Sequence, residues 1–428
     1  MSEAIINSEQ AAQYWPLPDV DLTNLDLFNR GFPHQVFTNL RRHHGALFHP
    51  RTALTPDGEG FWVFTRYHDI AAIAKDIDTF SSAGGGDRQG GGTMIEDLPQ
   101  EMGPGSVINM MDDPRHKALR RLIGPAITNA RVAAMEDILF AAAGAAVQAA
   151  LQQECVDFVS AIAAELPLFA IANLVGIPHD DRHQIFAWIN AVLDYSDRQL
   201  GETSISSQQG MQNFMAYGNK FVEEKRQKPG SDIVSLAVTG ELPKGLGKLT
   251  PLEQLMVFSV VMVAGLETTR NAIAGGILAF IHHPDQWLRL QQDGGLMNSA
   301  LDEILRWTSP TPYNRRTATR DVVIGDRLIR RGEKVTLWWA SANRDDTYYE
   351  QPFAFDIGRQ KNLHMAFGSG GHSCLGSQLA RLEMRVILLH LLDQVDGFRL
   401  EGDVNWVRSN KHTGIRSMLV RFVKRYHK

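Results

Sequence analysis

Apolar residues recur at helical spacing through nearly every segment between Asp112 and Phe280. A repeat of three to four residues is typical of helices that pack one face against a core. The longest such segment covers residues 252–284. Because this periodicity leaves space for only a minor β region, we predict a mainly α fold.

Short segments with alternating apolar residues predict small β-sheets near residue 60, between residues 310 and 340, and toward the C-terminus. In the second region, we expect strands over residues 320–329 and 334–342. Beyond about residue 20, no polar linker, composition break or repeat divides the chain. We therefore predict an N-terminal extension over residues 1–20 and one large helical domain over residues 21–428. Six of the nine residues 84–92 are glycine, so we expect a mobile surface loop there.

The composition excludes several classes of protein. With a net charge of −5, the chain has no overall attraction to nucleic acid or to an anionic membrane. The N-terminus lacks the features of a signal peptide or membrane anchor, and charged residues interrupt the longest apolar stretch. Two cysteines exclude a disulfide scaffold and fit a reducing compartment. We expect a soluble, cytoplasmic monomer.

One of the two cysteines, Cys374, lies in the glycine-rich stretch FGSGGHSCLG, residues 367–376. The stretch lacks the third glycine of a dinucleotide fingerprint and the Gly-Lys-Ser/Thr of a phosphate loop. No second cysteine lies at a spacing suited to zinc or an iron–sulfur cluster. The apolar periodicity that follows predicts a helix starting at or just after Cys374, where free N–H groups stabilise a thiolate. An axial ligand to haem iron, a catalytic nucleophile and an inert thiol all remain open on this stretch alone.

Two further groups of polar residues interrupt predicted helices. Glu303 and Arg306 are three residues apart, which suits either an exposed pair or, given their apolar neighbours, a buried one. Glu267 and Thr268 interrupt the long apolar helix. A hydroxyl bonding back to the carbonyl of Ala264 would explain Thr268, but not a buried carboxylate at Glu267.

With these motifs, the chain resembles the soluble bacterial cytochrome P450 monooxygenases from about residue 20 to its end. The strongest element is the pattern F-G-x-G-x-H-x-C-x-G around Cys374, and E-x-x-R and A-G-x-E-T-T occur in the expected order. Further matching segments are Asp112–Arg121, Ala342–Asp345 and Pro352–Arg359. The resemblance implies the cytochrome P450 fold, a single helical domain around a buried haem b. The local sequence around the long helix suggests the bacterial branch of this family that oxidises terpenoids, steroids and branched lipids.

The resemblance also implies roles for individual residues. Cys374 would be the axial thiolate and the metal ligand, and Glu267 and Thr268 would be the acid–alcohol pair that delivers protons to oxygen. Glu303, Arg306 and Arg359 would form a buried structural triad. The remaining haem contacts, including the cationic residues that suit propionates, would be His116, Arg120, Ala264, Arg316, Phe367, His372 and Gly376. By family position, the substrate pocket would include Met94, Phe186, Val260, Val263, Ala264, Pro312 and Ile415.

These apolar pocket residues imply a hydrophobic small-molecule substrate. The resemblance implies hydroxylation with O2 and two electrons from a ferredoxin that an NAD(P)H-dependent reductase serves. Arg115, Lys117, Arg120 and Arg121 form a local basic cluster that would suit an acidic partner. We expect Cys155 to be a small buried residue.

Other functions remain to be weighed. The first is a haem-thiolate sensor without turnover, although mere binding needs no acid–alcohol pair. A nucleotide-dependent oxidoreductase is the second, and a haem-free, colourless protein would favour it. A peroxide-driven enzyme of the same family would normally lack the pair.

Overall fold

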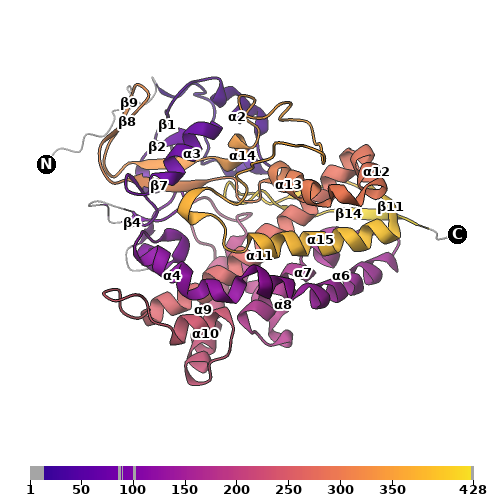
Figure 1. The fold of residues 1–428 in the computed structure, drawn as a ribbon. Coiled ribbons are helices and arrows are strands. Elements are labelled where there is room, and N and C mark those ends of the chain that lie inside the picture. The colour runs from indigo at the N-terminus through magenta and orange to yellow at the C-terminus, as the bar shows by residue number, and fades with distance from the viewer. Residues whose placement is uncertain (1–13, 85–87, 89, 100–102, 426–428) are drawn as a thin grey trace.

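The computed structural model describes residues 14–84, 88, 90–99 and 103–425. Figure 1 shows a large helical body with a smaller region rich in β-strands to one side. The prediction of a mainly α fold is confirmed. The first 13 residues, and residues 85–87 and 89 of the glycine-rich segment, lie outside the described part, so neither the predicted extension nor the loop is described in full.

The helical body is built around α11 (Pro251–His282), the long apolar helix. It starts at Thr250 with a capping box, since the Thr250 hydroxyl accepts from Glu253 N and the Glu253 carboxylate accepts from Thr250 N. Its length and composition would suffice to cross a membrane, but half of its most apolar stretch is buried inside the protein. The helices around it are α4 (Arg115–Ile123), α5 (Asn129–Ala133), α6 (Glu136–Leu151), α7 (Glu165–Val175), α8 (Arg182–Leu193), α9 (Ile205–Gln227), α10 (Ile233–Thr239), α12 (Pro284–Gln292), α13 (Met297–Thr308) and α15 (Ser377–Gln394).

The main sheet has the strand order β1–β2–β10–β7–β3. All its neighbouring pairs are antiparallel except β2 and β10, which are parallel. The bounds of its strands are Leu47–His49 for β1, Phe61–Phe64 for β2, Phe80–Ser81 for β3, Asn314–Ala318 for β7 and Lys334–Leu337 for β10. Three short helices lie in this region, α2 (His34–Arg41), α3 (Tyr67–Lys75) and α14 (Trp339–Ala342).

Four smaller sheets complete the fold. One has three strands in the order β11–β14–β6, and the others are the pairs β4–β5, β8–β9 and β12–β13. Their bounds are Gly90–Gly91 (β4), Leu98–Pro99 (β5), Val156–Asp157 (β6), Val322–Ile324 (β8), Arg327–Ile329 (β9), Val395–Leu400 (β11), Asn405–Trp406 (β12), Ile415–Ser417 (β13) and Leu419–Lys424 (β14).

Two predicted strands differ from the structure. Residues 320–329 form the antiparallel pair β8 and β9 instead of one strand. Residues 334–342 were expected to be a continuous strand, but β10 ends at Leu337 and the chain turns into α14. Trp338 still donates its N–H to Phe64 O of β2, while its carbonyl accepts from Ala342 N and so begins the helical turn. Trp338 and Trp339 are both buried. The apolar residues of this segment therefore reflect burial on both sides of the chain and not a continuous strand.

Candidate functional site

The glycine-rich loop presents Cys374 from beneath a cavity. The Cys374 N–H donates to Phe367 O at 2.8 Å, which closes the loop, and α15 begins three residues later. Gly368 and Gly370 have φ of 71° and 74°, a region that favours glycine. A Cβ on Gly370 would lie 2.5 Å from Ala74 O of α3, so a side chain there would also clash.

The Cys374 side chain lines this cavity, whose volume is about 330 Å³. Burial raises the pKa of the thiol, and the Gly376 N–H with the charges of Arg120 and Arg381 offsets only part of that effect. A metal ion that coordinates the sulfur deprotonates such a thiol outright. Apolar side chains from several elements form most of the walls, among them Ile108, Ile123, Ile127, Leu305, Trp339, Ala366, Phe367 and Leu379.

Cationic and imidazole groups gather at one edge of the cavity. The rings of His116 and His372 stack with centroids 3.8 Å apart, and Arg120 donates to Ser373 O at 2.8 Å. Arg316 lies outside the cavity lining, although its charge acts on His372; it is buried, and among the described residues its side chain donates only to the Arg315 carbonyl. Burial, followed by the charges of Arg316, His116 and Arg120, lowers the pKa of His372 to about 2.

The positive charge near this edge comes from Arg120 and Arg316, and the Asp113 carboxylate lies 3.2 Å from His116 Nδ1. Burial lowers the pKa of Arg316 to about 10, and the nearby Asp112 carboxylate offsets only part of the effect. The His372 Nδ1 atom is buried without a hydrogen-bond partner in the described chain. A ligand with carboxylate groups would satisfy these cations and the unpaired nitrogen.

On the opposite wall, α11 separates the members of the predicted acid–alcohol pair. Thr268 lines the cavity, and its hydroxyl donates to Ala264 O at 2.8 Å, the back-bonding arrangement weighed from the sequence. Glu267 is only 3% exposed and does not line the cavity. Its carboxylate accepts from Arg270 Nη2 at 2.6 Å and from Asn271 Nδ2 at 3.0 Å.

Arg270 keeps Glu267 ionised. Burial alone would raise the pKa of Glu267, but the charges of Arg270 and His412 and the hydrogen bond from Asn271 lower it overall. Arg270 also donates to Asn190 Oδ1 of α8 at 3.1 Å, so it joins the carboxylate to the neighbouring helix. The sequence analysis did not identify this role of Arg270, although its position three residues after Glu267 indicates a shared helix face.

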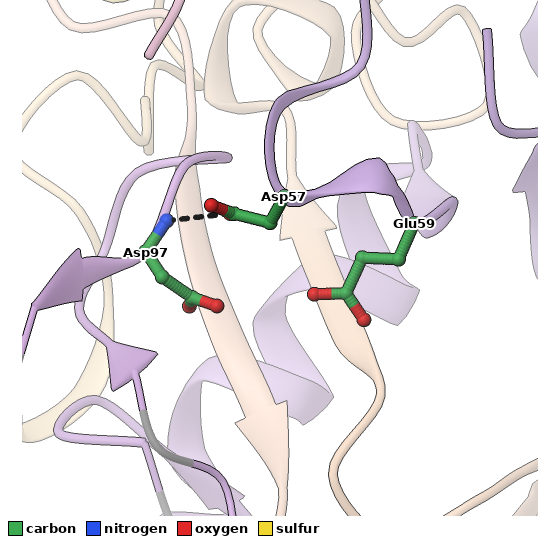
Figure 2. Close-up of side chains that lie close together, drawn as sticks. All are labelled: Asp57, Glu59 and Asp97. Carbon is green, nitrogen blue, oxygen red and sulfur yellow. Dashed lines mark hydrogen bonds between the residues drawn. The ribbon is translucent and has the colours of Figure 1, made fainter. Parts of the chain in front are cut away.

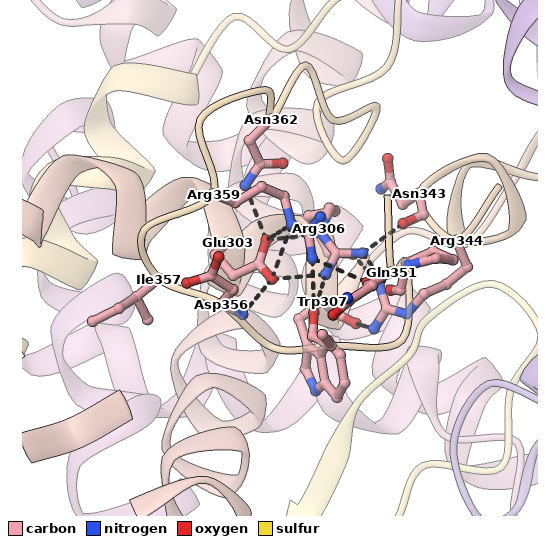
Figure 3. Close-up of polar contacts among 12 residues, drawn as sticks. Glu303, Arg306, Trp307, Asn343, Arg344, Gln351, Asp356, Ile357, Arg359 and Asn362 are labelled. Atoms are coloured by element: carbon pink, nitrogen blue, oxygen red, sulfur yellow. Dashed lines mark hydrogen bonds and ion pairs between the residues drawn. The ribbon is translucent and has the colours of Figure 1, made fainter. Parts of the chain in front are cut away.

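Glu303, Arg306 and Arg359 meet in a buried network beside the cavity, as Figure 3 shows. Glu303 and Arg306 are both fully buried, and their closest nitrogen–oxygen distance is 2.7 Å. Arg359 Nε lies 3.2 Å from the Glu303 carboxylate. Further hydrogen bonds extend the network: Asp356 N and Asn362 Nδ2 donate to Glu303, and the carbonyls of Asn343, Pro352 and Ala354 accept from Arg306.

The predicted pocket residues divide into two groups. Val260 and Ala264 line the cavity. The others lie outside its lining: Phe186 is half-buried on α8, Ile415 is 1% exposed on β13, Met94 and Val263 are half-buried, and Pro312 is buried.

The predicted basic cluster is smaller than expected. Arg115 is bound to Glu253 and to the carbonyl of Leu246, and Arg120 turns toward the cavity. Lys117 and Arg121 remain exposed. The expectation that Cys155 is buried was wrong, because its side chain is partly exposed.

Three carboxylates also lie close together outside the cavity: Asp57, Glu59 and Asp97 (Figure 2). Three cations already neutralise them. Lys334 Nζ lies 2.6 Å from Asp57 and 3.0 Å from Glu59, Arg315 lies 2.7 Å from Asp97, and Arg88 contacts both Glu59 and Asp97. Because charges balance within it, this cluster is an ion network that fastens Arg88 and Asp97 to β7 and β10 of the main sheet.

Comparisons with known proteins identify the family. The cytochrome P450 family profile matches residues 168–411. The chain is 40% identical over 406 residues to cytochrome P450 126 of Mycobacterium tuberculosis, covering 94% of this chain and 97% of that protein. It is 33% identical to linalool 8-monooxygenase of Pseudomonas putida, covering 94% and 98%. The chain therefore belongs to the cytochrome P450 family.

The fold agrees with this assignment. A Mycobacterium marinum cytochrome P450 solved with pseudoionone superimposes with a TM-score of 0.86 at 30% identity, covering 95% of this chain and 99% of that one. The protein is a haem-thiolate monooxygenase, an oxidoreductase that uses O2 and electrons from a redox partner. The cavity fits haem, since a sulfur, an apolar slot and a cationic edge match its iron, ring and propionates.

Proposed function

We propose that this protein hydroxylates a branched hydrophobic small molecule, with Cys374 as the axial thiolate. The observation that carries the proposal is that Cys374 and Thr268 of α11 line one and the same cavity. One oxygen atom enters a C–H bond and the other leaves as water, with two electrons and two protons consumed. Haem supplies the activation of O2 when it is bound.

The residues of the chain supply the rest. His116, Arg120, Arg316 and His372 hold the propionates and so fix the orientation of the cofactor. The apolar walls exclude water and hold the substrate near Val260 and Ala264. The Thr268 hydroxyl would hold a proton donor at the cavity, and Glu267, which Arg270 orients, would exchange protons with solvent as the acid of the pair.

Replacing the cysteine tests the ligand. The reduced, CO-bound protein is expected to show the strongly red-shifted Soret band of thiolate ligation, and Cys374→Ser is expected to lose it. Cys155→Ser is the matched control, because that side chain lies away from the cavity, and it should keep the band. A wild-type band at the position typical of histidine ligation would contradict the proposal.

The proposed substrate is a terpenoid, a steroid or a methyl-branched lipid. Two relatives support this class, since one is named for linalool and the other was solved with pseudoionone. The apolar lining offers several aliphatic side chains that suit a methyl-branched chain.

We further propose that a ferredoxin with its NAD(P)H-dependent reductase delivers the electrons in the cytoplasm, where two unpaired cysteines are stable. Lys117 and Arg121 of α4, both exposed, would attract an acidic partner. The rate of reduction by a ferredoxin should then fall as ionic strength rises, and stopped-flow measurement checks it.

A non-turnover sensor would bind haem and CO without forming product from any substrate.

A further inference from the structure

Lys411 is a buried lysine in the turn that precedes β13, with only 8% of its surface exposed. The Ser409 hydroxyl accepts from Lys411 N at 3.0 Å and from His412 N at 3.3 Å, so this side chain closes the turn. Lys411 Nζ forms an ion pair with the Glu96 carboxylate and donates to the Tyr195 hydroxyl at 2.5 Å. A buried ammonium group is costly unless partners of this kind neutralise it. Lys411 therefore joins three segments that are far apart in the chain.

The connection between α8 and α9, residues 194–204, is held by two more cations of the same C-terminal segment. Arg416 binds the Asp194 carboxylate with two hydrogen bonds of 2.6 and 2.9 Å. Arg408 donates to the Tyr195 carbonyl at 2.8 Å. These three cations, which converge on one connection, are called the clasp: Arg408, Lys411 and Arg416.

The segments that the clasp joins lie directly behind the cavity walls. Thr413 N, next to the clasp turn, donates to the carbonyl of Pro310 at 2.9 Å, and Pro310 lines the cavity. The β4–β5 connection, which carries Glu96, is joined to β7 by a hydrogen bond of 2.8 Å from Arg315 N to Thr93 O. α8 is joined to α11 by the side chain of Arg270. Both β7 and α11 contribute wall residues, so movement of these connections would move the walls.

Lys411 is the central member of the clasp. The Lys411 and Glu96 side chains are 9% and 12% exposed, whereas those of Arg416 and Asp194 are 44% and 35% exposed. Ion pairs between exposed groups contribute little and are screened by salt, but a buried pair is costly to break. None of the clasp residues lines the cavity, so they act on its walls and not on a ligand.

We propose that the clasp is a kinetic gate that controls how fast a small molecule enters and leaves the haem cavity. While it is closed, the α8–α9 and β4–β5 connections stay packed behind the walls. When it opens, these connections separate and a hydrophobic molecule can pass. The inference rests on the proposed function, in which the substrate must reach the haem, and segment opening of this kind commonly limits ligand exchange.

Ligand entry can be timed with 4-phenylimidazole, an azole that binds haem iron and shifts the Soret band. Mixing it with the holoenzyme in a stopped-flow instrument gives the association and dissociation rate constants. The double variant Lys411→Met/Glu96→Gln removes the buried pair without leaving either charge unpaired. Both rate constants are expected to rise roughly tenfold, equivalent to about 1.4 kcal/mol, the scale of a hydrogen bond to a charged group. Because both rise together, the Kd should stay nearly constant.

Two further variants complete the test. Tyr195→Phe removes a single hydrogen bond and should give a smaller rise of the same kind. Lys248→Met is the matched control, because Lys248 pairs with Glu241 and both side chains are exposed, at 70% and 69%. Its rate constants should equal those of the wild type. Hydrogen–deuterium exchange of the backbone amides over residues 93–97 and 194–204 should be faster in the double variant.

Wild-type rate constants and amide exchange in both the double variant and Tyr195→Phe would overturn the proposal. A rise in the dissociation rate constant alone would also overturn it, since that is the behaviour of a residue that contacts the ligand. If the double variant fails to bind haem, Tyr195→Phe and its amide exchange decide the question. A wild type that binds the azole but hydroxylates nothing would instead reject the proposed function, which keeps the two failures distinct.

Discussion

At the scale of single residues, the Thr268 hydroxyl already makes one hydrogen bond within its own helix. The Thr268 hydroxyl donates its hydrogen bond to the Ala264 carbonyl. Toward the cavity, its oxygen can therefore act only as an acceptor. A group placed to accept can hold a water or another donor there. Thr268 therefore combines the structural explanation weighed from the sequence with the proposed catalytic one.

Thr268→Ala is expected to uncouple the reaction, because the variant loses the oxygen that positions the proton donor. Reductant and O2 would still be consumed, but most O2 would leave as hydrogen peroxide instead of entering product. NADH, peroxide and product measured in parallel check this. Thr268→Ser keeps the hydroxyl and should remain largely coupled. Full coupling in Thr268→Ala would leave the residue with only its hydrogen bond to the Ala264 carbonyl within α11.

At the scale of elements, the network around Glu303 joins α13 to the loop over residues 343–362. Arg306 donates to carbonyls of that loop, and Glu303 receives three donors from it. Each buried charge thus depends on partners from a distant segment (Figure 3). Removing one partner leaves the others without compensation.

Glu303→Ala is therefore expected to destabilise the fold by about 3–5 kcal/mol and to yield haem-poor protein. Thermal unfolding and the ratio of haem to protein absorbance are the measurements. Glu223→Ala is a matched control, because Glu223 and Arg226 also form a pair three residues apart, but on an exposed helix face. Comparable effects of the two substitutions would contradict a special role for burial.

At the scale of the whole molecule, the cavity lies where segments far apart in the chain meet. Its walls come from α4, α7, α10, α11, α13, α14, α15 and β7, together with the loop that carries Cys374. Most of the side chains it exposes are apolar, and the polar ones are concentrated at the cationic edge and on α11. The shape of the substrate that the cavity accepts is thus decided by the folded molecule as a whole.

We expect terpenoids, steroids and methyl-branched lipids to shift the ferric haem from low to high spin, because an apolar ligand displaces water from the cavity. A titration of each compound followed in the visible spectrum measures the shift. Linear fatty acids of similar length are the comparison set, and they should bind more weakly. Shifts from linear acids alone would reject the proposed substrate class.

The sequence by itself determined the helical body, the positions of most elements and the family, because helical periodicity and the motif around Cys374 are local properties of the chain. It also favoured burial of Glu303 and Arg306, since their apolar neighbours are adjacent in sequence. The short helix α14 after Leu337 was not predictable in this way. Its residues are buried on both sides, and a run of apolar residues of this kind resembles a buried strand.

Only the tertiary structure decided how the functional side chains are used. Arg270 binds the Glu267 carboxylate, which lies outside the cavity lining. Glu253 of α11 forms an ion pair with Arg115 of α4. Both contacts join residues from different turns or helices. Glu383 of α15 instead makes no hydrogen bond or ion pair within the described part of the chain, and burial raises its pKa well above the usual range. A sequence shows which groups can ionise, but their charge and direction depend on the neighbours that folding brings to them.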